Sequence, residues 1–143
     1  MLPEGRQQQI VDGARAVLSK LALAPNSIVV FDIDDTLITP TGKPYVPVID
    51  LYNEVLANGI HTGLITARSG DKSNVDATFD QLHRVGVADW SVAYFRSPKQ
   101  MDVARFKRNA RKDLWTKGYH VVMTVGDKEW DHGDYGGFSV LIH

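Results

Sequence analysis

The stretch Ile28–Leu37, IVVFDIDDTL, decides the fold. Its four leading apolar residues predict a buried β-strand, and acids at two alternate positions follow directly. Because side chains two residues apart in an extended chain point the same way, Asp32 and Asp34 can converge just past the strand end. That is where an open parallel α/β sheet binds its ligands. Asp35 is expected to cap the turn that follows, since Asp residues commonly bond their own backbone.

Polar residues also end two later apolar runs. The run 63–65 leads into Thr66, and the run that starts at Val121 reaches Asp127, with Asp131 a few residues beyond. Three expected strand ends therefore carry, in chain order, an acid pair, a hydroxyl and a second acid pair. Each of these would be a common structural cap if it stood alone. Together they indicate a chemical site.

Short apolar runs alternate with helical patterns along the chain. We expect strands at about 27–33, 60–66, 90–96, 120–126 and 137–142. Amphipathic helices are expected between them, ending near Gly59, Gly86 and Gly118. This alternation, with near-continuous apolar strands, predicts an α/β fold: a doubly wound, Rossmann-like, mostly parallel five-stranded sheet with helices on both faces.

Composition sets the outer bounds. With 143 residues, 43% of them hydrophobic, the chain can bury one core but not two, so we expect a single domain over 1–143. The formal charge of −1 gives no basic field that would attract nucleic acid over the whole surface. The absence of cysteine excludes disulfides, thiolate metal sites and a cysteine nucleophile. No apolar run approaches a membrane span, so no membrane partner is expected.

The N-terminal segment is predicted to be an amphipathic helix at about 6–22. Its apolar residues recur at helical spacing: Ile10, Ala14, Val17, Leu18 and Leu21. A basic leading region is missing, acids precede the apolar part and Lys20 interrupts it, which argues against a signal peptide. We therefore expect a cytoplasmic or otherwise intracellular location.

Four segments together resemble the motifs of the haloacid dehalogenase superfamily of phosphohydrolases. They are 31–37 (FDIDDTL), 65–68 (ITAR), 106–112 (FKRNARK) and 118–131 (GYHVVMTVGDKEWD). They are most similar to the acid phosphatase branch, which includes class B and class C enzymes and plant vegetative storage proteins. The resemblance covers nearly the whole chain from about residue 27 onward. The chain departs from that branch at Ala67, where the branch has Gly, and at Lys128-Glu129, where it has another polar pair.

The resemblance implies a Mg²⁺-dependent phosphomonoester hydrolase that acts through an aspartyl-phosphate intermediate. Asp32 would be the nucleophile, and Asp34 the general acid and then the general base. The catalytic set is Asp32, Asp34, Thr66 and Lys107; substrate binding falls to Thr66, Ala67, Arg68, Lys107 and Arg111; the metal residues are Asp32, Asp34 through its main-chain carbonyl, Asp127, and Asp131 through water or an outer-shell hydrogen bond.

The phosphate-binding lysine has two candidates. Lys107 follows Phe106 in a helix whose apolar stripe faces the sheet, so its amine could reach the strand ends. Lys99 follows Pro98 and has the surroundings of a loop residue. Lys107 is the preferred choice.

The expected elements nearly fill the intervals between these motifs, so no cap domain is expected. An open site fits either a bulky substrate or a homo-oligomer in which a neighbouring subunit covers the site. We expect a small phosphomonoester substrate; the alternatives are a polynucleotide 3′-phosphatase acting on a nucleic-acid end, or a non-catalytic storage or binding protein on the same scaffold. A receiver-type phosphoacceptor is disfavoured, because its acid pair follows the first strand and its phosphorylated Asp lies on a later one.

Overall fold

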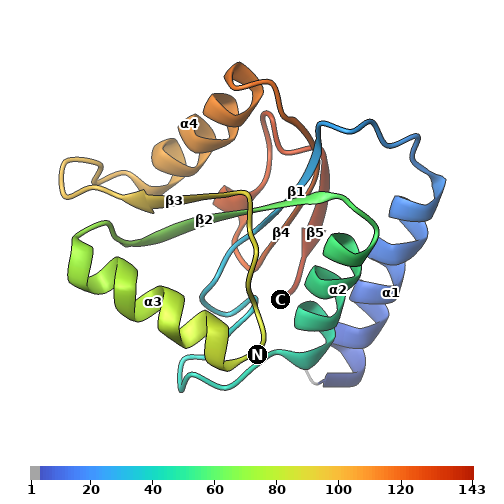
Figure 1. Ribbon diagram of the computed structural model, residues 1–143, viewed down its shortest axis with the longest axis horizontal. Helices are drawn as coiled ribbons and strands as arrows, with labels where there is room; N and C mark the ends of the chain where they lie inside the picture. The colour runs from blue at the N-terminus through green and yellow to red at the C-terminus, as the bar shows by residue number, and fades with distance from the viewer. Residues whose placement is uncertain (1–3) are drawn as a thin grey trace.

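The computed structural model describes residues 4–143, and residues 1–3 of the expected domain 1–143 lie outside the described residues. Its centre is a five-stranded sheet in which every neighbouring pair is parallel, in the order β3-β2-β1-β4-β5 (Figure 1). The strands are β1 (Ser27–Phe31), β2 (His61–Ser69), β3 (Val92–Arg96), β4 (His120–Gly126) and β5 (Phe138–Leu141). The predicted parallel α/β fold is confirmed.

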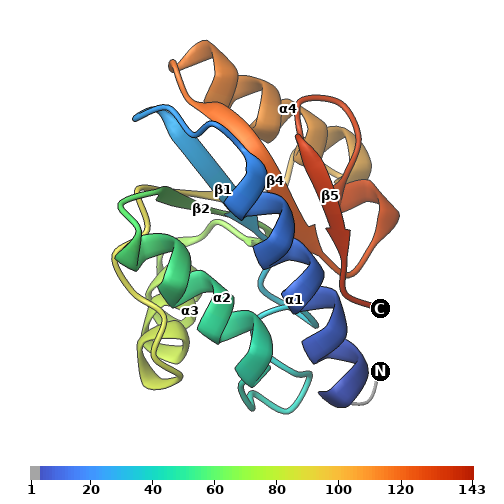
Figure 2. The ribbon, with the colours of Figure 1, turned by 90° about the vertical axis from the view of Figure 1, so that its right-hand side faces the viewer.

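Four helices cover the two faces of the sheet: α1 (Glu4–Lys20), α2 (Val46–Ala57), α3 (Lys72–Arg84) and α4 (Val103–Thr116). Figure 2 shows α1 and α2 side by side, with α4 across the sheet from them. A short 3₁₀ turn, η1 (Glu129–Asp131), follows β4. The helix expected at 6–22 is present but ends at Lys20, where the Leu21 amide bonds the Leu18 carbonyl in a tighter final turn. None of the helices within residues 4–143 is long and apolar enough to cross a membrane.

Alternation along β1 divides the core into two layers. Val29 and Phe31 join the core beneath α1 and α2, whereas Ile28 and Val30 pack with Phe106 and other residues of α4. A strand places every second side chain on the same face. The next residue with the parity of Val30 is residue 32, so the acid that follows β1 is directed toward α4.

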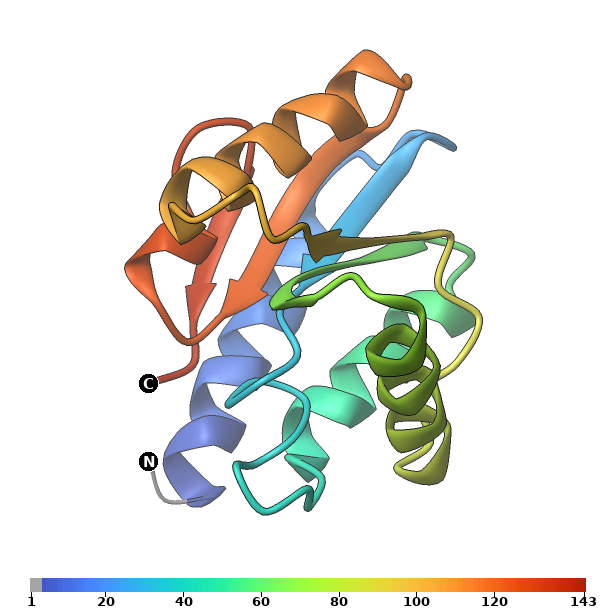
Figure 3. The ribbon, with the colours of Figure 1, turned by 90° about the vertical axis from the view of Figure 1, so that its left-hand side faces the viewer.

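The strand order reverses beside β1. The chain adds β2 and β3 on one side of β1 and then returns to place β4 on the other side. The Asp32 amide continues this pairing by donating to the Val125 carbonyl at 2.9 Å. Ligands of open α/β sheets bind at such a reversal of strand order. Figure 3 shows β4 and β5 pointing to this carboxyl edge of the sheet, near the C-terminus.

The strand expected at 27–33 ends earlier, at Phe31. The amides of Thr36, Leu37 and Ile38 all donate to the Ile33 carbonyl, so the chain turns there, with Asp35 in the left-handed region at φ 57°. Asp35 therefore lies in the turn, as expected, but its Oδ1 accepts the Tyr45 hydroxyl at 3.2 Å, and the capping bond to its own backbone stays a prediction.

A short hairpin follows, which we call the 38–44 hairpin because Ile38 pairs with Pro44 in antiparallel fashion. The hairpin leads directly into α2. Between β2 and β3 the chain forms α3, and between β3 and β4 it forms α4. Within residues 4–143 there is accordingly no cap domain, as expected.

Candidate active site

Lys107 lies at the centre of the site. The face of α4 that carries Phe106 and Ala110 is buried against the sheet, and this packing carries Lys107 inward until its side chain is only 3% exposed. Its ammonium group donates to Asp32 Oδ1 at 2.7 Å, to Asp131 Oδ1 at 2.5 Å and to the Ile65 carbonyl at 3.1 Å. These contacts use all three donors of the ammonium group. They join α4 to the ends of β1 and β2 and to η1.

Charge in this cluster is unbalanced. Burial raises the pKa of Asp32 well above its ordinary value, and the nearby Asp131 and Asp127 add to the rise, whereas Lys107 opposes it. Burial acts to lower the pKa of Lys107, but Asp32 and Asp131 outweigh it and raise that pKa above the usual value. The two shifts have different main causes: burial raises the pKa of Asp32, whereas the neighbouring carboxylates raise that of Lys107.

A divalent cation would correct this imbalance. Asp32, Asp127 and Asp131 each offer a carboxylate oxygen, and these oxygens lie within 4.8 Å of one another. Hard oxygen donors are the ligands that Mg²⁺ and Ca²⁺ prefer. Asp127 is partly exposed while the other two are buried, so the set is reachable from solvent on one side. The residues present therefore fit a divalent metal.

The close approach of Asp131 depends on Gly126. A Cβ atom at position 126 would lie 2.5 Å from Asp131 Oδ2 and 2.6 Å from its Cβ, which no real packing allows. Asp131 Oδ2 also accepts the Lys128 amide at 3.0 Å and so closes the η1 turn. The Gly-Asp pair and the later Asp thus form one compact loop, in which Gly126 leaves the space that Asp131 fills.

Asp34 lies at the exposed side of the site and is held by Arg68. The guanidinium donates to both carboxylate oxygens, at 2.9 and 2.7 Å. Its remaining contacts are with Thr78 Oγ1 at 3.2 Å and Gln81 Oε1 at 2.8 Å on α3. The sequence predicted that Arg68 binds substrate. In the structure its donors are directed to Asp34 and α3, so it holds the acid in place.

Arg111 also has a different setting from the one predicted. It lies one helical turn after Lys107 on the buried face of α4 and was expected to bind substrate. Its guanidinium instead donates to main-chain carbonyls of the loop after β4: Trp130, Asp131 and His132 at 3.1 Å each, and Asp134 at 2.9 Å. Burial lowers its pKa. These contacts brace the loop that carries Asp131. The role of Arg111 in substrate binding stays a prediction.

A family model supplies the decisive comparison. The model of the haloacid dehalogenase (HAD) superfamily, subfamily IIIB (Acid phosphatase), matches residues 40–135. The chain belongs to this subfamily. The matched range contains Thr66, Lys107 and Asp127 but begins after Asp32, which the contact with Lys107 joins to the rest of the site.

Two solved structures show the same fold as this HAD chain. Both are the class C acid phosphatase from Bacillus anthracis. The one with tungstate bound has a TM-score of 0.70 at 19% identity, and the other has 0.72 at 18%. Each alignment covers 90% of this chain and 64% of the phosphatase, so the chain spans just under two thirds of that protein's length. A search of curated protein sequences finds no match.

The remaining predicted residues of this subfamily IIIB chain lie at the end of β2 or near it. Thr66 is fully buried, and its Oγ1 accepts the Arg68 amide at 3.1 Å. The Ala67 carbonyl accepts from Arg96 Nε at 3.0 Å. Lys99 is exposed on the turn between β3 and α4. The structure therefore brings Lys107, and not Lys99, to Asp32.

Sequence reasoning missed Thr36. This residue is fully buried, and its Oγ1 lies 3.5 Å from Asp32 Oδ2, on the side of the carboxylate away from Lys107. Its place four residues after Asp32 in the first motif was the available signal, but a threonine in a turn has many structural uses.

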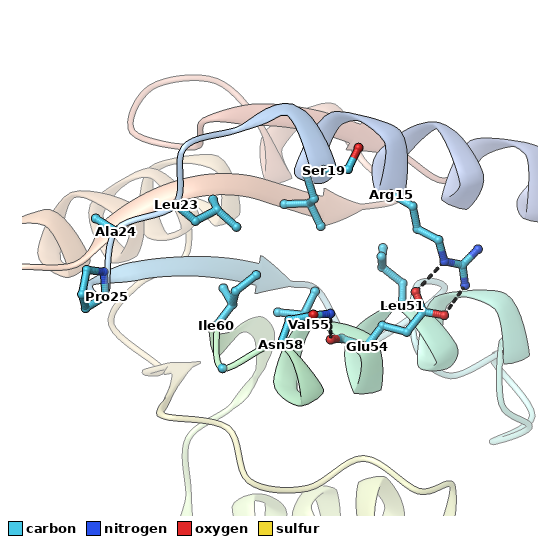
Figure 4. A pocket seen from close by; sticks show the side chains of 12 residues that line it. Arg15, Ser19, Leu23, Ala24, Pro25, Leu51, Glu54, Val55, Asn58 and Ile60 are labelled. Atoms are coloured by element: carbon cyan, nitrogen blue, oxygen red, sulfur yellow. Dashed lines mark hydrogen bonds and ion pairs between the residues drawn. The ribbon is translucent and has the colours of Figure 1, made fainter.

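Two hollows of similar size lie at opposite ends of the strands, one where the strands end and one where they begin. The first, about 630 Å³, lies beside the acid cluster and is lined by Asp35, Thr39, Pro40, Thr41, Lys43, Asp127, Lys128 and His143. The second, about 600 Å³, lies between α1, α2 and the segment before β1 (Figure 4). None of the predicted site residues lines the second. We call them the carboxyl-edge hollow and the amino-edge groove.

Proposed function

We propose that this chain is a Mg²⁺-dependent phosphomonoester hydrolase that acts through an aspartyl-phosphate on Asp32. One observation carries the proposal: Lys107 joins Asp32 to Asp131 in a buried cluster, and an Asp127 oxygen lies within 4.8 Å of an oxygen of each acid. A buried cation beside a strand-end carboxylate suits the attack of that carboxylate on a phosphoryl group, because it opposes the negative charge that gathers there.

In the first step an Asp32 oxygen forms a bond to phosphorus while the bond to the leaving oxygen breaks. Lys107 and the Thr66 hydroxyl would hold the phosphoryl oxygens, and Asp34 would give a proton to the leaving oxygen. Water then attacks the aspartyl-phosphate and loses its proton to Asp34, which releases inorganic phosphate and restores Asp32.

Arg68 sets where Asp34 can act. Both Asp34 oxygens accept hydrogen bonds from the guanidinium in the structure. To donate a proton, Asp34 must turn at least one oxygen away from Arg68 toward the leaving group. Asp34 is more than half exposed, so this rotation meets little packing.

Asp32, Asp127 and the Asp34 main-chain carbonyl would hold Mg²⁺, with Asp131 supporting it from the outer shell. When bound, the ion supplies positive charge against the phosphoryl oxygens. Asp131 fits the supporting role because both of its oxygens already accept hydrogen bonds, from Lys107 and from the Lys128 amide.

A substrate panel tests this function. We expect hydrolysis of p-nitrophenyl phosphate and of small monoesters such as nucleoside monophosphates in Mg²⁺, and none in EDTA. A 3′-phosphorylated oligonucleotide in the same panel tests the polymer alternative. Stoichiometric binding of these esters with no phosphate release, in any divalent metal, would refute the enzyme and leave a binding protein.

A further inference from the structure

The carboxyl-edge hollow opens directly beside the proposed reaction centre. Asp127, a proposed metal ligand, forms part of its wall, and so does Asp35, the neighbour of Asp34. The opposite wall belongs to the 38–44 hairpin and the last residue, His143. Asp34 itself is not among the lining residues, but its neighbour Asp35 and the metal ligand Asp127 place the hollow next to the reaction centre.

The hairpin wall has a fixed backbone. The Thr39 amide donates to the Lys43 carbonyl at 2.8 Å, and the Lys43 amide returns a bond to Thr39 Oγ1 at 3.0 Å. Gly42 lies between them at φ 83°, a conformation that favours glycine. Lys43 is thus presented from a closed turn, with its side chain exposed.

Lys128 is presented from the other side of the hollow. Its amide is held by Asp131 Oδ2 at 3.0 Å, and its side chain is exposed. It is one of the two positions where the chain departs from the polar pair of the acid phosphatase branch. Two lysines, from segments far apart in sequence, therefore line one hollow.

The two acids that line the hollow, Asp35 and Asp127, are already engaged elsewhere. Asp35 Oδ1 accepts the Tyr45 hydroxyl at 3.2 Å, and Asp127 faces the metal cluster. None of the ion pairs found within residues 4–143 involves Lys43 or Lys128. Positive charge in this wall is available to a ligand.

We propose that Lys43 and Lys128 bind a second anionic group on the leaving-group side of the substrate. The substrate class is then a small phosphomonoester whose leaving group carries a further phosphate or carboxylate. Lysine ammonium groups bind such anions as point charges. A hollow of about 630 Å³ has the size of a small-molecule site and not of a polymer channel. This inference rests on the proposed function and deepens it.

The test compares two esters that differ in one charge. Para-carboxyphenyl phosphate carries the second anion, and para-carbamoylphenyl phosphate is its neutral counterpart with a similar leaving group. We expect wild-type protein to favour the carboxylate in kcat/KM by about tenfold, the scale of one charge-assisted contact. The preference should shrink as salt is raised, because exposed charges are screened.

In the double variant Lys43→Gln, Lys128→Gln the ratio should fall to about one. Lys20→Gln, an exposed lysine at the end of α1, is the matched control and should keep the wild-type ratio. A double variant that turns over both esters with the ratio unchanged would overturn the inference and leave the hydrolase intact.

Two further outcomes show whether the second anion belongs to a small substrate or to a nucleic-acid polymer. Faster hydrolysis of adenosine 3′,5′-bisphosphate than of a 3′-phosphorylated hexathymidylate would support a small substrate. The reverse order, lost in the double variant, would assign the lysines to a polymer and overturn the proposal. Failure of wild-type protein to hydrolyse any of these esters would remove the proposed function itself.

Discussion

The amino-edge groove and the carboxyl-edge hollow have nearly the same volume, about 600 and 630 Å³, yet they differ in chemistry. Apolar side chains such as Leu18, Leu51 and Ile60 line most of the groove, and its charges lie in one ion pair at the side (Figure 4). The hollow adjoins three acids and a buried lysine. In a parallel sheet all carboxyl ends share one edge, so the residues that follow the strands gather there. Volume alone does not locate the chemistry.

The ion pairs at the two edges also differ in energetic weight. Arg15 and Glu54 meet at 2.5 Å in the groove, but their side chains are 30% and 48% exposed. Such pairs contribute about 0–1 kcal/mol, because water competes with them. Lys107 and Asp131 are 3% and 2% exposed. Removing one partner of such a buried pair lowers the unfolding free energy by about 3–5 kcal/mol, because the remaining charge is buried without a partner or water.

The strongest test of the carboxyl edge is Asp32→Asn. We expect turnover to fall by about 10⁴-fold or more, the scale seen when a nucleophile is removed. The fold should persist, since the amide is nearly isosteric and relieves the excess of carboxylates, so the urea midpoint in EDTA should not fall. Asp80→Asn, an exposed acid on α3, is the control. A variant that keeps a tenth of the wild-type rate would show that Asp32 is not the nucleophile.

Lys107→Ala should lower kcat by about 10²-fold or more, because a charge-stabilising donor is lost. It should also cost about 3–5 kcal/mol of unfolding free energy, measured by urea titration, since two buried carboxylates lose their cation. If this variant does not fold, Lys107→Arg keeps the charge but misplaces the donors and should show the kinetic loss alone. Lys99→Ala is the matched control on the exposed turn. A larger kinetic loss from Lys99→Ala would reverse the assignment.

Removing a carboxylate ligand should change the metal requirement. For Asp127→Ala we expect the Mg²⁺ concentration for half-maximal activity to rise by at least about 10–100-fold, the range found for disturbed metal sites. Asp134→Ala removes an exposed acid that pairs with Arg108 and should leave the requirement unchanged. Activity of the wild type that persists in EDTA would contradict the metal assignment altogether.

The smallest effect is expected at the amino edge. Arg15→Ala and Glu54→Gln should leave kcat/KM unchanged and lower the unfolding free energy by about 1 kcal/mol at most. Steady-state kinetics and urea titration check the two statements separately. A tenfold loss in kcat/KM from either variant would show that the groove takes part in the reaction, and the contrast between the edges would no longer hold.

Sequence patterns predicted the strands well because burial on both faces leaves an apolar run that local inspection can find. They also favoured Lys107 over Lys99, because its neighbour Phe106 marks the face of α4 that meets the sheet. The partners of Arg68 and Arg111 could not be predicted in this way. Arg68 meets an acid 34 positions earlier, and Arg111 meets carbonyls about 20 positions later. Those contacts depend on how whole elements pack. Every residue has a main-chain carbonyl, so the sequence does not show which carbonyls Arg111 meets.

The hollow between the 38–44 hairpin and the β4–η1 loop was missed for the same reason. Lys128 was noted only as a departure from the acid phosphatase pattern, and Lys43 carried no signal of its own. Both lysines line this hollow because β1 ends at Phe31, two residues before the expected strand end, and the chain then turns at Asp35 into the 38–44 hairpin.

The three acceptors of the Lys107 ammonium group lie 75, 42 and 24 positions away in sequence. They can meet only when β1, β2, α4 and η1 have all taken their places, so the cluster depends on contacts between residues far apart in sequence. A cation that binds the completed cluster binds the native state and not the unfolded chain. The site is therefore also a reporter of folding, because it forms only when β1, β2, α4 and η1 have their native arrangement.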